Sequence, residues 1–295
     1  MSQAWLAQRE RGTLGALRLI TWITLHLGYG AGRALLFPIC AYFIVFSRAA
    51  RRGSREFLER VLGRRATWRD IARHYHTFAA SILDRVLIAR RGMADIDARV
   101  HGADDVMDAF ARGRGLLLLG SHLGSFEVVR AAAAIEPKLI VNIVMHEGNA
   151  GQIAAWLRQV APDFAPRLIE PVHGDATLRI RDALARGEVV AMLGDRPIGR
   201  SPTRPVSFLG AKAQFPTGPA RLALALDVPI VTFFGLYRGP RSYDVYFEAL
   251  TPNRALARDA AVADVVERYV QRLEARTRSA PYNWFNFYAY WSEAA

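Results

Sequence analysis

The stretch Gly115-Leu-Leu-Leu-Leu-Gly120-Ser121-His122-Leu123-Gly124-Ser125-Phe126-Glu127 decides the fold of this chain. Four consecutive leucines bounded by glycines are typical of a strand that is buried on both faces of a mostly parallel sheet. The alanine-rich residues 128–134 then predict a helix, which Ser121 or Ser125 could cap. A histidine and a carboxylate therefore lie at the carboxyl end of a strand, where open α/β sheets bind their ligands.

Strand and helix patterns alternate on both sides of this stretch. Helices are predicted over 103–112, 176–185, 220–226 and 259–277, and strands over 100–102, 139–145, 189–193, 228–234 and 242–248. A hairpin is predicted between residues 202 and 214. The alternation indicates βαβ units, so we expect an α/β fold with a mostly parallel mixed sheet flanked by helices.

The N-terminal region contains two apolar runs, over 14–27 and 34–46, joined by a glycine-rich segment and followed by arginines from Arg48 onward. Neither run reaches the roughly 20 residues that a membrane-spanning helix needs. Three arrangements fit: helices lying in one leaflet, a single tilted span, or a pair of core helices. We divide the chain into an apolar, membrane-associating region over 1–50 and a second domain over 51–295.

Net charge and cysteine content limit the kinds of partner and site that the chain can have. The 295-residue chain has a net charge of +12, which suits an acidic partner such as nucleic acid, anionic lipid or an acidic carrier protein. The basic residues are scattered over predicted helices instead of alternating with aromatics in one groove, which disfavours nucleic acid. The single cysteine, Cys40, excludes an internal disulfide and a multi-cysteine zinc site, and we predict no metal site.

His122 and Glu127 together have the chemistry of a catalyst that activates an alcohol. A neutral imidazole can take a hydroxyl proton near pH 7, and a carboxylate can fix its tautomer and stabilise the resulting cation. The two can meet if His122 lies in the turn and Glu127 in the first helical turn, but a surface or capping pair has the same spacing. Ser125, between them, is a candidate for binding the substrate.

Two further segments supply candidate binding residues. The strand over 189–193 delivers Asp195 and Arg196 to the same sheet edge as His122, although a solvated turn fits these residues equally well. A second segment, Phe215-Pro-Thr217-Gly218-Pro219, opens a helix whose N-terminus could bind an anion or a polarised carbonyl. Arg221 lies one turn into that helix.

Residues 120–127, Gly-Ser-His-Leu-Gly-Ser-Phe-Glu, resemble the histidine-four-residues-carboxylate motif of the lysophospholipid acyltransferase superfamily. They are most similar to the bacterial lipid A lauroyl/myristoyl acyltransferase family, which has Glu at the second position. The apolar N-terminus and the blocks over 192–199, 215–221 and 281–287 follow in that family's order, so the resemblance covers nearly the whole chain. In the 215–221 block, Thr217 stands where the wider superfamily has an acidic residue.

The resemblance implies an O-acyltransferase domain over 51–295, an N-terminal membrane anchor, and a location on the cytoplasmic face of a bacterial inner membrane. His122 would remove the acceptor's hydroxyl proton and Glu127 would orient His122, while Asp195 and Arg196 would bind or orient a substrate. The acyl donor would be a thioester of acyl carrier protein or of coenzyme A, which is a co-substrate, so no cofactor is expected.

The implied partners are acyl carrier protein, membrane lipids and a lipid or glycolipid acceptor similar to lipid A. Close lipid A enzymes carry an arginine ahead of the helix that precedes the Asp loop. Here that arginine is shifted to Arg179 or missing, so a polyene or another glycolipid is an alternative acceptor. A non-catalytic, membrane-bound lipid-binding protein is the alternative from another class.

Overall fold

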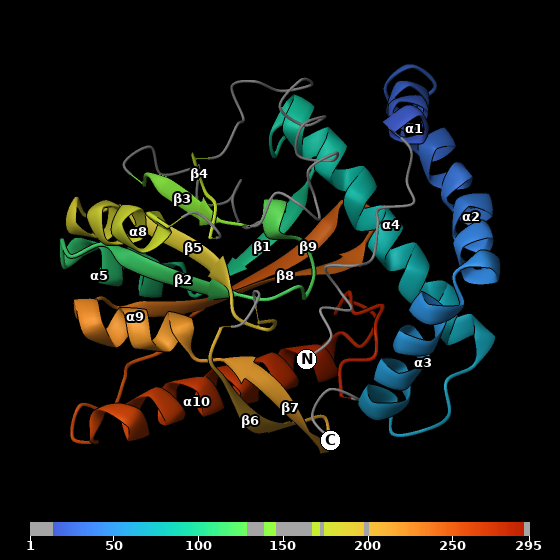
Figure 1. Cartoon of the computed structure of the whole chain (residues 1–295). Helices are drawn as coiled ribbons and strands as arrows, with labels where there is room; N and C mark the ends of the chain where they lie inside the picture. Colours follow the sequence, from blue (N-terminus) through green and yellow to red (C-terminus); the bar gives the residue numbers. More distant parts are fainter. Residues whose placement is uncertain (1–13, 129–138, 146–166, 172–173, 198–200, 292–295) are drawn as a thin grey trace.

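The computed structural model describes residues 14–128, 139–145, 167–171, 174–197 and 201–291. Its first four helices stand together beside the sheet (Figure 1): α1 (Leu14–His26), α2 (Tyr29–Phe46), α3 (Arg48–Leu62) and α4 (Trp68–Arg91). The predicted glycine-rich joint over 28–33 is shorter than expected, because α2 begins at Tyr29 and Gly28 alone takes the left-handed φ of 92°. Thr67 caps α4 in a capping box with Asp70.

The main sheet of the described residues has seven strands in the order β1-β9-β8-β2-β5-β3-β4. All neighbouring pairs are parallel except β8 and β9, which are antiparallel, so the prediction of a mostly parallel mixed sheet is confirmed. The strands are β1 (Asp97–His101), β2 (Leu116–Gly120), β3 (Val141–Val144), β4 (Arg167–Ile169), β5 (Val189–Leu193), β8 (Ile230–Gly239) and β9 (Ser242–Ala249).

The four leucines of β2 are buried on both faces of the sheet. Leu117 and Leu119 belong to the larger hydrophobic cluster, which also contains residues of α8 (Ala176–Ala185), α9 (Gly218–Leu226) and α10 (Arg258–Ser279). Leu116 and Leu118 point the other way, into a cluster that includes α5 (Ala103–Ala111). Each fully buried leucine contributes roughly 1.5–3 kcal/mol, so this strand is a central part of the core.

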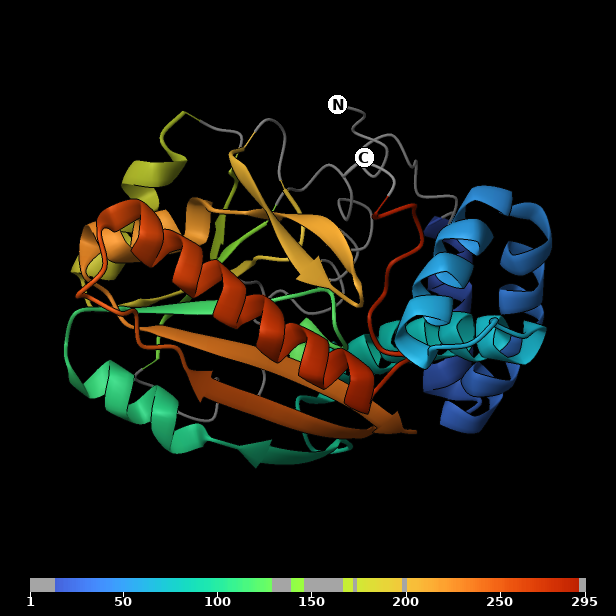
Figure 2. The same ribbon diagram turned by 90° about the horizontal axis from the view of Figure 1, so that it is seen from below.

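Helix α10 runs across one face of the sheet beside the hairpin of β6 (Thr203–Phe208) and β7 (Ala211–Pro216), as Figure 2 shows. The predicted hairpin is therefore confirmed. Of the helix expected after His122, residues 126–128 are helical and the remainder, over 129–134, lies outside the described residues.

Candidate active site

His122 and Asp195 follow two neighbouring strands, β2 and β5, and each lies the same number of residues beyond the end of its strand. In the parallel register of β2 and β5, Gly120 pairs with Leu193, so each of the two side chains comes two residues beyond a paired position. The ends of the two strands are also joined by a hydrogen bond, since Gly194 N donates to Gly120 O at 2.9 Å. As a result, His122 Nδ1 lies 2.9 Å from Asp195 Oδ1, and the His122 backbone N–H donates to Asp195 Oδ2 at 3.1 Å.

This contact fixes the tautomer of His122. A carboxylate only accepts hydrogen bonds, so Nδ1 carries the proton and Nε2 keeps the lone pair that can take one. The Asp195 side chain is fully buried, whereas 36% of the His122 side chain is exposed. The pair therefore has the arrangement of a base that faces outward and a buried carboxylate that orients it.

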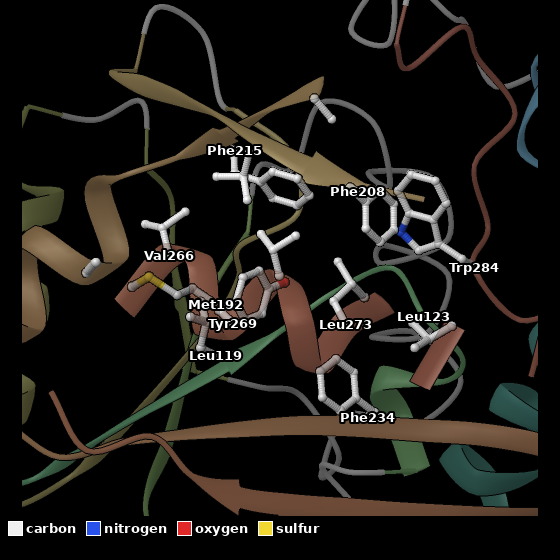
Figure 3. Packing of buried hydrophobic residues seen from close by; sticks show 14 of the residues in the cluster. Leu119, Leu123, Met192, Phe208, Phe215, Phe234, Val266, Tyr269, Leu273 and Trp284 are labelled. Atoms are coloured by element: carbon white, nitrogen blue, oxygen red, sulfur yellow. The ribbon is translucent and has the colours of Figure 1, made fainter. Parts of the chain in front are cut away.

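Two aromatic side chains from the end of the chain hold Asp195 in place. The Trp284 indole N–H donates to Asp195 Oδ2 at 3.0 Å, and the Tyr290 hydroxyl donates to the Asp195 carbonyl at 2.6 Å. Figure 3 shows Trp284 beside Phe208, above Leu123, the residue after His122. Both rings are buried, so the carboxylate is enclosed by protein on this side.

The segment that carries Trp284 is bonded to the turn of His122 itself. Phe285 N donates to His122 O at 2.9 Å, and Gly124 N donates to Asn283 O at 2.8 Å. Gly124 has a φ of 77° and lies so close to Gly235 that a Cβ would meet the Gly235 carbonyl oxygen at 1.9 Å. Only glycine fits at this position, because both the backbone conformation and the space exclude a side chain.

A second layer of contacts joins this segment to the N-terminal helices. The imidazole of His74, on α4, is fully buried between two polar atoms, with Nδ1 2.8 Å from Ser54 Oγ and Nε2 3.0 Å from the Trp284 carbonyl. Burial lowers the pKa of His74 to about 4, so this ring is neutral at physiological pH. A chain of contacts thus runs from α3 through His74 and Trp284 to Asp195.

Electrostatics keep Asp195 ionised and His122 neutral. Burial lowers the pKa of His122, and the positive charge of Arg196 lowers it further against the opposing attraction of Asp195. Burial would raise the pKa of Asp195, but His122, Arg196 and the Trp284 indole outweigh it and hold that pKa well below its usual range. Arg196 is fixed close by, since its guanidinium donates to Phe285 O at 2.8 Å and lies 5.1 Å from the centre of the Tyr288 ring.

The lowered pKa of His122 predicts the pH dependence of any reaction in which it acts as a base. Activity requires neutral His122, so kcat/KM should fall only as the pH drops below the ordinary histidine range. Replacing Arg196 by Gln removes a positive charge, raises the pKa of His122 and should move this acidic limb to higher pH. A pH profile of kcat/KM for both proteins checks the prediction, and an unshifted or oppositely shifted limb would contradict it.

The carboxylate at Nδ1 is Asp195, while the expected orienting role of Glu127 stays a prediction. Residues 123 and 124 form bridges to the segments around Trp284 and Gly235, so the chain runs on for several residues before the helix that carries Glu127 begins at residue 126. Glu127 is half-buried in that first turn. Ser125 is buried, its N–H donates to Gly235 O, and its hydroxyl has no hydrogen-bond partner in the described part of the chain.

The candidates around α9 make contacts of a different kind. The Thr217 hydroxyl donates to the Pro202 carbonyl at 3.2 Å and accepts from Arg221 Nε at 3.3 Å. Arg221 in turn lies 3.4 Å from Asp259 on α10. The structure therefore joins Asp195 and Arg196 to His122, whereas Thr217 and Arg221 belong to a network between α9 and α10, with Gly218 as the first residue of α9.

Trp284, Tyr290 and His74 are residues of the site that sequence reasoning did not identify. The described aromatic side chains near the C-terminus pack mostly in the core. The sequence pattern does not reveal the hydrogen bonds of their polar atoms, because nothing in it shows which acceptor a tryptophan N–H reaches.

Comparison with known protein families finds a match over most of the chain. A protein-family model described as bacterial lipid A biosynthesis acyltransferase matches residues 14–293, nearly the whole chain. A search of curated proteins found no significant match. The match includes both strand ends that carry His122 and Asp195 and the C-terminal segment that holds them. The chain therefore belongs to the bacterial lipid A biosynthesis acyltransferase family.

Proposed function

We propose that this acyltransferase moves a fatty acyl chain from a thioester, with acyl carrier protein as the donor, to a hydroxyl of a lipid A-like acceptor. The observation that supports the proposal is the His122–Asp195 pair, in which a partly exposed imidazole with its lone pair on Nε2 is oriented by a buried carboxylate. Such a pair activates a hydroxyl group for attack on a carbonyl.

The proposed reaction has no acyl-enzyme, because a thioester is already activated. The acceptor hydroxyl gives its proton to His122 Nε2 as its oxygen attacks the thioester carbonyl. When the tetrahedral intermediate collapses, the C–S bond breaks and the leaving thiolate receives the proton from the imidazolium. Asp195 stabilises that imidazolium, and Trp284 keeps Asp195 ionised and in position.

Charge supports acyl carrier protein as the donor. The chain has a net charge of +12, and an acidic carrier would be steered toward it by long-range attraction. Arg196 is close enough to the pair to interact with negative charge that develops on the carbonyl oxygen. Coenzyme A thioesters have the same reactive group, and comparison of the two donors in one assay separates them.

We also propose that the protein works at the cytoplasmic face of a bacterial inner membrane. Among the described residues, α2 is the one helix that is long and apolar enough to cross a bilayer by length and composition, with 18 residues and a mean hydropathy of 1.5. Only 17% of those residues are buried in the protein. An exposed apolar helix brings the site to the place where both acyl chains and lipid acceptors are found.

The proposal is tested by mass spectrometry of lipids from cells that express the wild-type protein or His122→Ala. The expected result is that one lipid class gains the mass of one fatty acyl group only with the wild-type protein. The class that gains it identifies the acceptor, including another glycolipid or a polyene. Identical lipid profiles for the two proteins would contradict the proposal and would favour a lipid-binding protein without transferase activity.

A further inference from the structure

The first two helices expose large apolar side chains that the rest of the protein leaves uncovered. On α2, only Gly32, Leu36 and Cys40 are buried. Seven large apolar residues of α1, α2 and the turn between them have more than half of their surface exposed, and they are Leu19, Trp22, Leu27, Phe37, Tyr42, Val45 and Phe46. Figure 1 shows these helices on the outer side of α4, away from the sheet.

Helix α2 lies along α4 in the opposite direction and is held to it by polar and apolar contacts. The Tyr29 hydroxyl donates to Asp84 at 2.7 Å, Leu36 packs with Ala80 and Leu83, and the Phe37 and His76 rings are 4.9 Å apart. If α2 crossed a bilayer, α4 would enter it alongside. Since α4 carries charged residues along its length (Arg69, Asp70, Arg73, Asp84 and Arg85), that arrangement is strongly unfavourable.

Arginines gather where the apolar surface ends. Arg48, Arg51, Arg52 and Arg55 lie at the start of α3, and Trp68 is 60% exposed at the start of α4. The Arg51 and Arg55 guanidinium groups lie 5.7 and 5.4 Å from the centre of the Trp68 ring. We call these five residues the basic corner.

The charge of the basic corner is not neutralised by its neighbours. The nearby acidic side chains have other partners: Glu56 pairs with Arg60, Glu59 accepts from Ala66 N, and Asp70 pairs with Arg64. Within the described residues, Arg51 donates to the carbonyls of Ile44 and Val45, and none of the corner's arginines pairs with a carboxylate.

We propose that α1 and α2 lie in the plane of an anionic lipid leaflet and that the basic corner binds lipid phosphates beside Trp68. Apolar side chains enter the acyl region while the arginines stay at the phosphate level, and tryptophan prefers that same level. A phosphate-bearing surface fits better than a second copy of this chain, because two basic corners would repel each other. This inference deepens the proposed function by specifying how the protein meets its membrane.

Flotation of the purified full-length protein with lipid vesicles tests the proposal without any acyl transfer. Wild-type protein should float with phosphatidylcholine vesicles that contain phosphatidylglycerol, more weakly with phosphatidylcholine alone, and less as salt rises. The triple variant Arg48→Gln, Arg52→Gln, Arg55→Gln should bind the anionic vesicles roughly a hundredfold more weakly, from the usual contribution of each surface arginine. Trp68→Ala should weaken binding to both kinds of vesicle.

The matched control removes the same charge elsewhere, with Arg99→Gln, Arg112→Gln and Arg258→Gln, three exposed arginines outside the N-terminal helices. Leu178→Ala is the control for Trp68→Ala, since Leu178 is an exposed apolar residue on α8.

Equal losses for the two triple variants, or no flotation with any vesicle, would overturn the proposal. If labels on the two ends of α2 were accessible from opposite sides of the vesicle membrane, that result would also overturn the proposal. His122→Ala should float normally, so failure of membrane binding and failure of catalysis are distinguishable.

Discussion

His122→Ala should lose transferase activity almost completely, with kcat/KM lower by about three orders of magnitude, the upper part of the range for removal of a general base. Without the imidazole, the acceptor hydroxyl has to attack while still protonated. No other described histidine contacts the Asp195 carboxylate, so no other described imidazole is oriented to act as the base here. Initial rates of acyl transfer from an acyl carrier protein thioester measure the effect.

The variant should still fold, which makes the loss interpretable. The His122 side chain is partly exposed, and its backbone N–H continues to donate to Asp195 after the substitution. The Trp284 indole also remains bonded to the carboxylate. An unchanged melting temperature, together with activity within tenfold of wild type, would show that another group supplies the base.

Asp195→Asn should also lower kcat/KM, by about two to four orders of magnitude. The amide is uncharged, so it no longer stabilises the imidazolium. Its NH2 group can also donate to Nδ1, which would place the imidazole proton on Nε2 and remove the base. Because the Asp195 carboxylate accepts three hydrogen bonds in a fully buried position, the melting temperature should fall as well.

Glu127→Gln is the informative comparison for this variant, since Glu127 is the carboxylate that the sequence motif predicts as the partner of His122. The geometry places Asp195 at Nδ1, so Glu127→Gln should lower kcat/KM much less than Asp195→Asn does. Parallel assays of the two variants at one pH measure the difference. A larger loss for Glu127→Gln would assign the orienting role to Glu127.

The strands of the fold were predictable because their burial pattern is local. Four leucines between glycines fix β2, and Gly187 and Gly194 bound its neighbour β5, whereas β8 runs past the predicted end at residue 234 to Gly239. The order of the strands is not local, and the sequence alone placed Asp195 only at the same edge as His122. Their contact depends on β5 being the neighbour of β2, which is a property of the whole sheet.

The contact between His122 and Asp195 could not be predicted from neighbouring residues for the same reason. Glu127 is close in sequence, but the bridges at Leu123 and Gly124 carry the chain onward before the helix begins. Trp284 reaches Asp195 from 89 positions away in the chain. By contrast, the capping box at Thr67 was predictable, because all of its atoms come from four consecutive residues.

A double-mutant cycle with His122→Ala and Asp195→Asn tests most directly that these two residues act as one catalytic unit. The kcat/KM of acyl transfer is measured for the wild type, both single variants and the double variant. If the imidazole is the base and the carboxylate acts only through it, the double variant should be about as slow as His122→Ala alone. Losses that multiply would mean that the two residues act independently and would contradict the account.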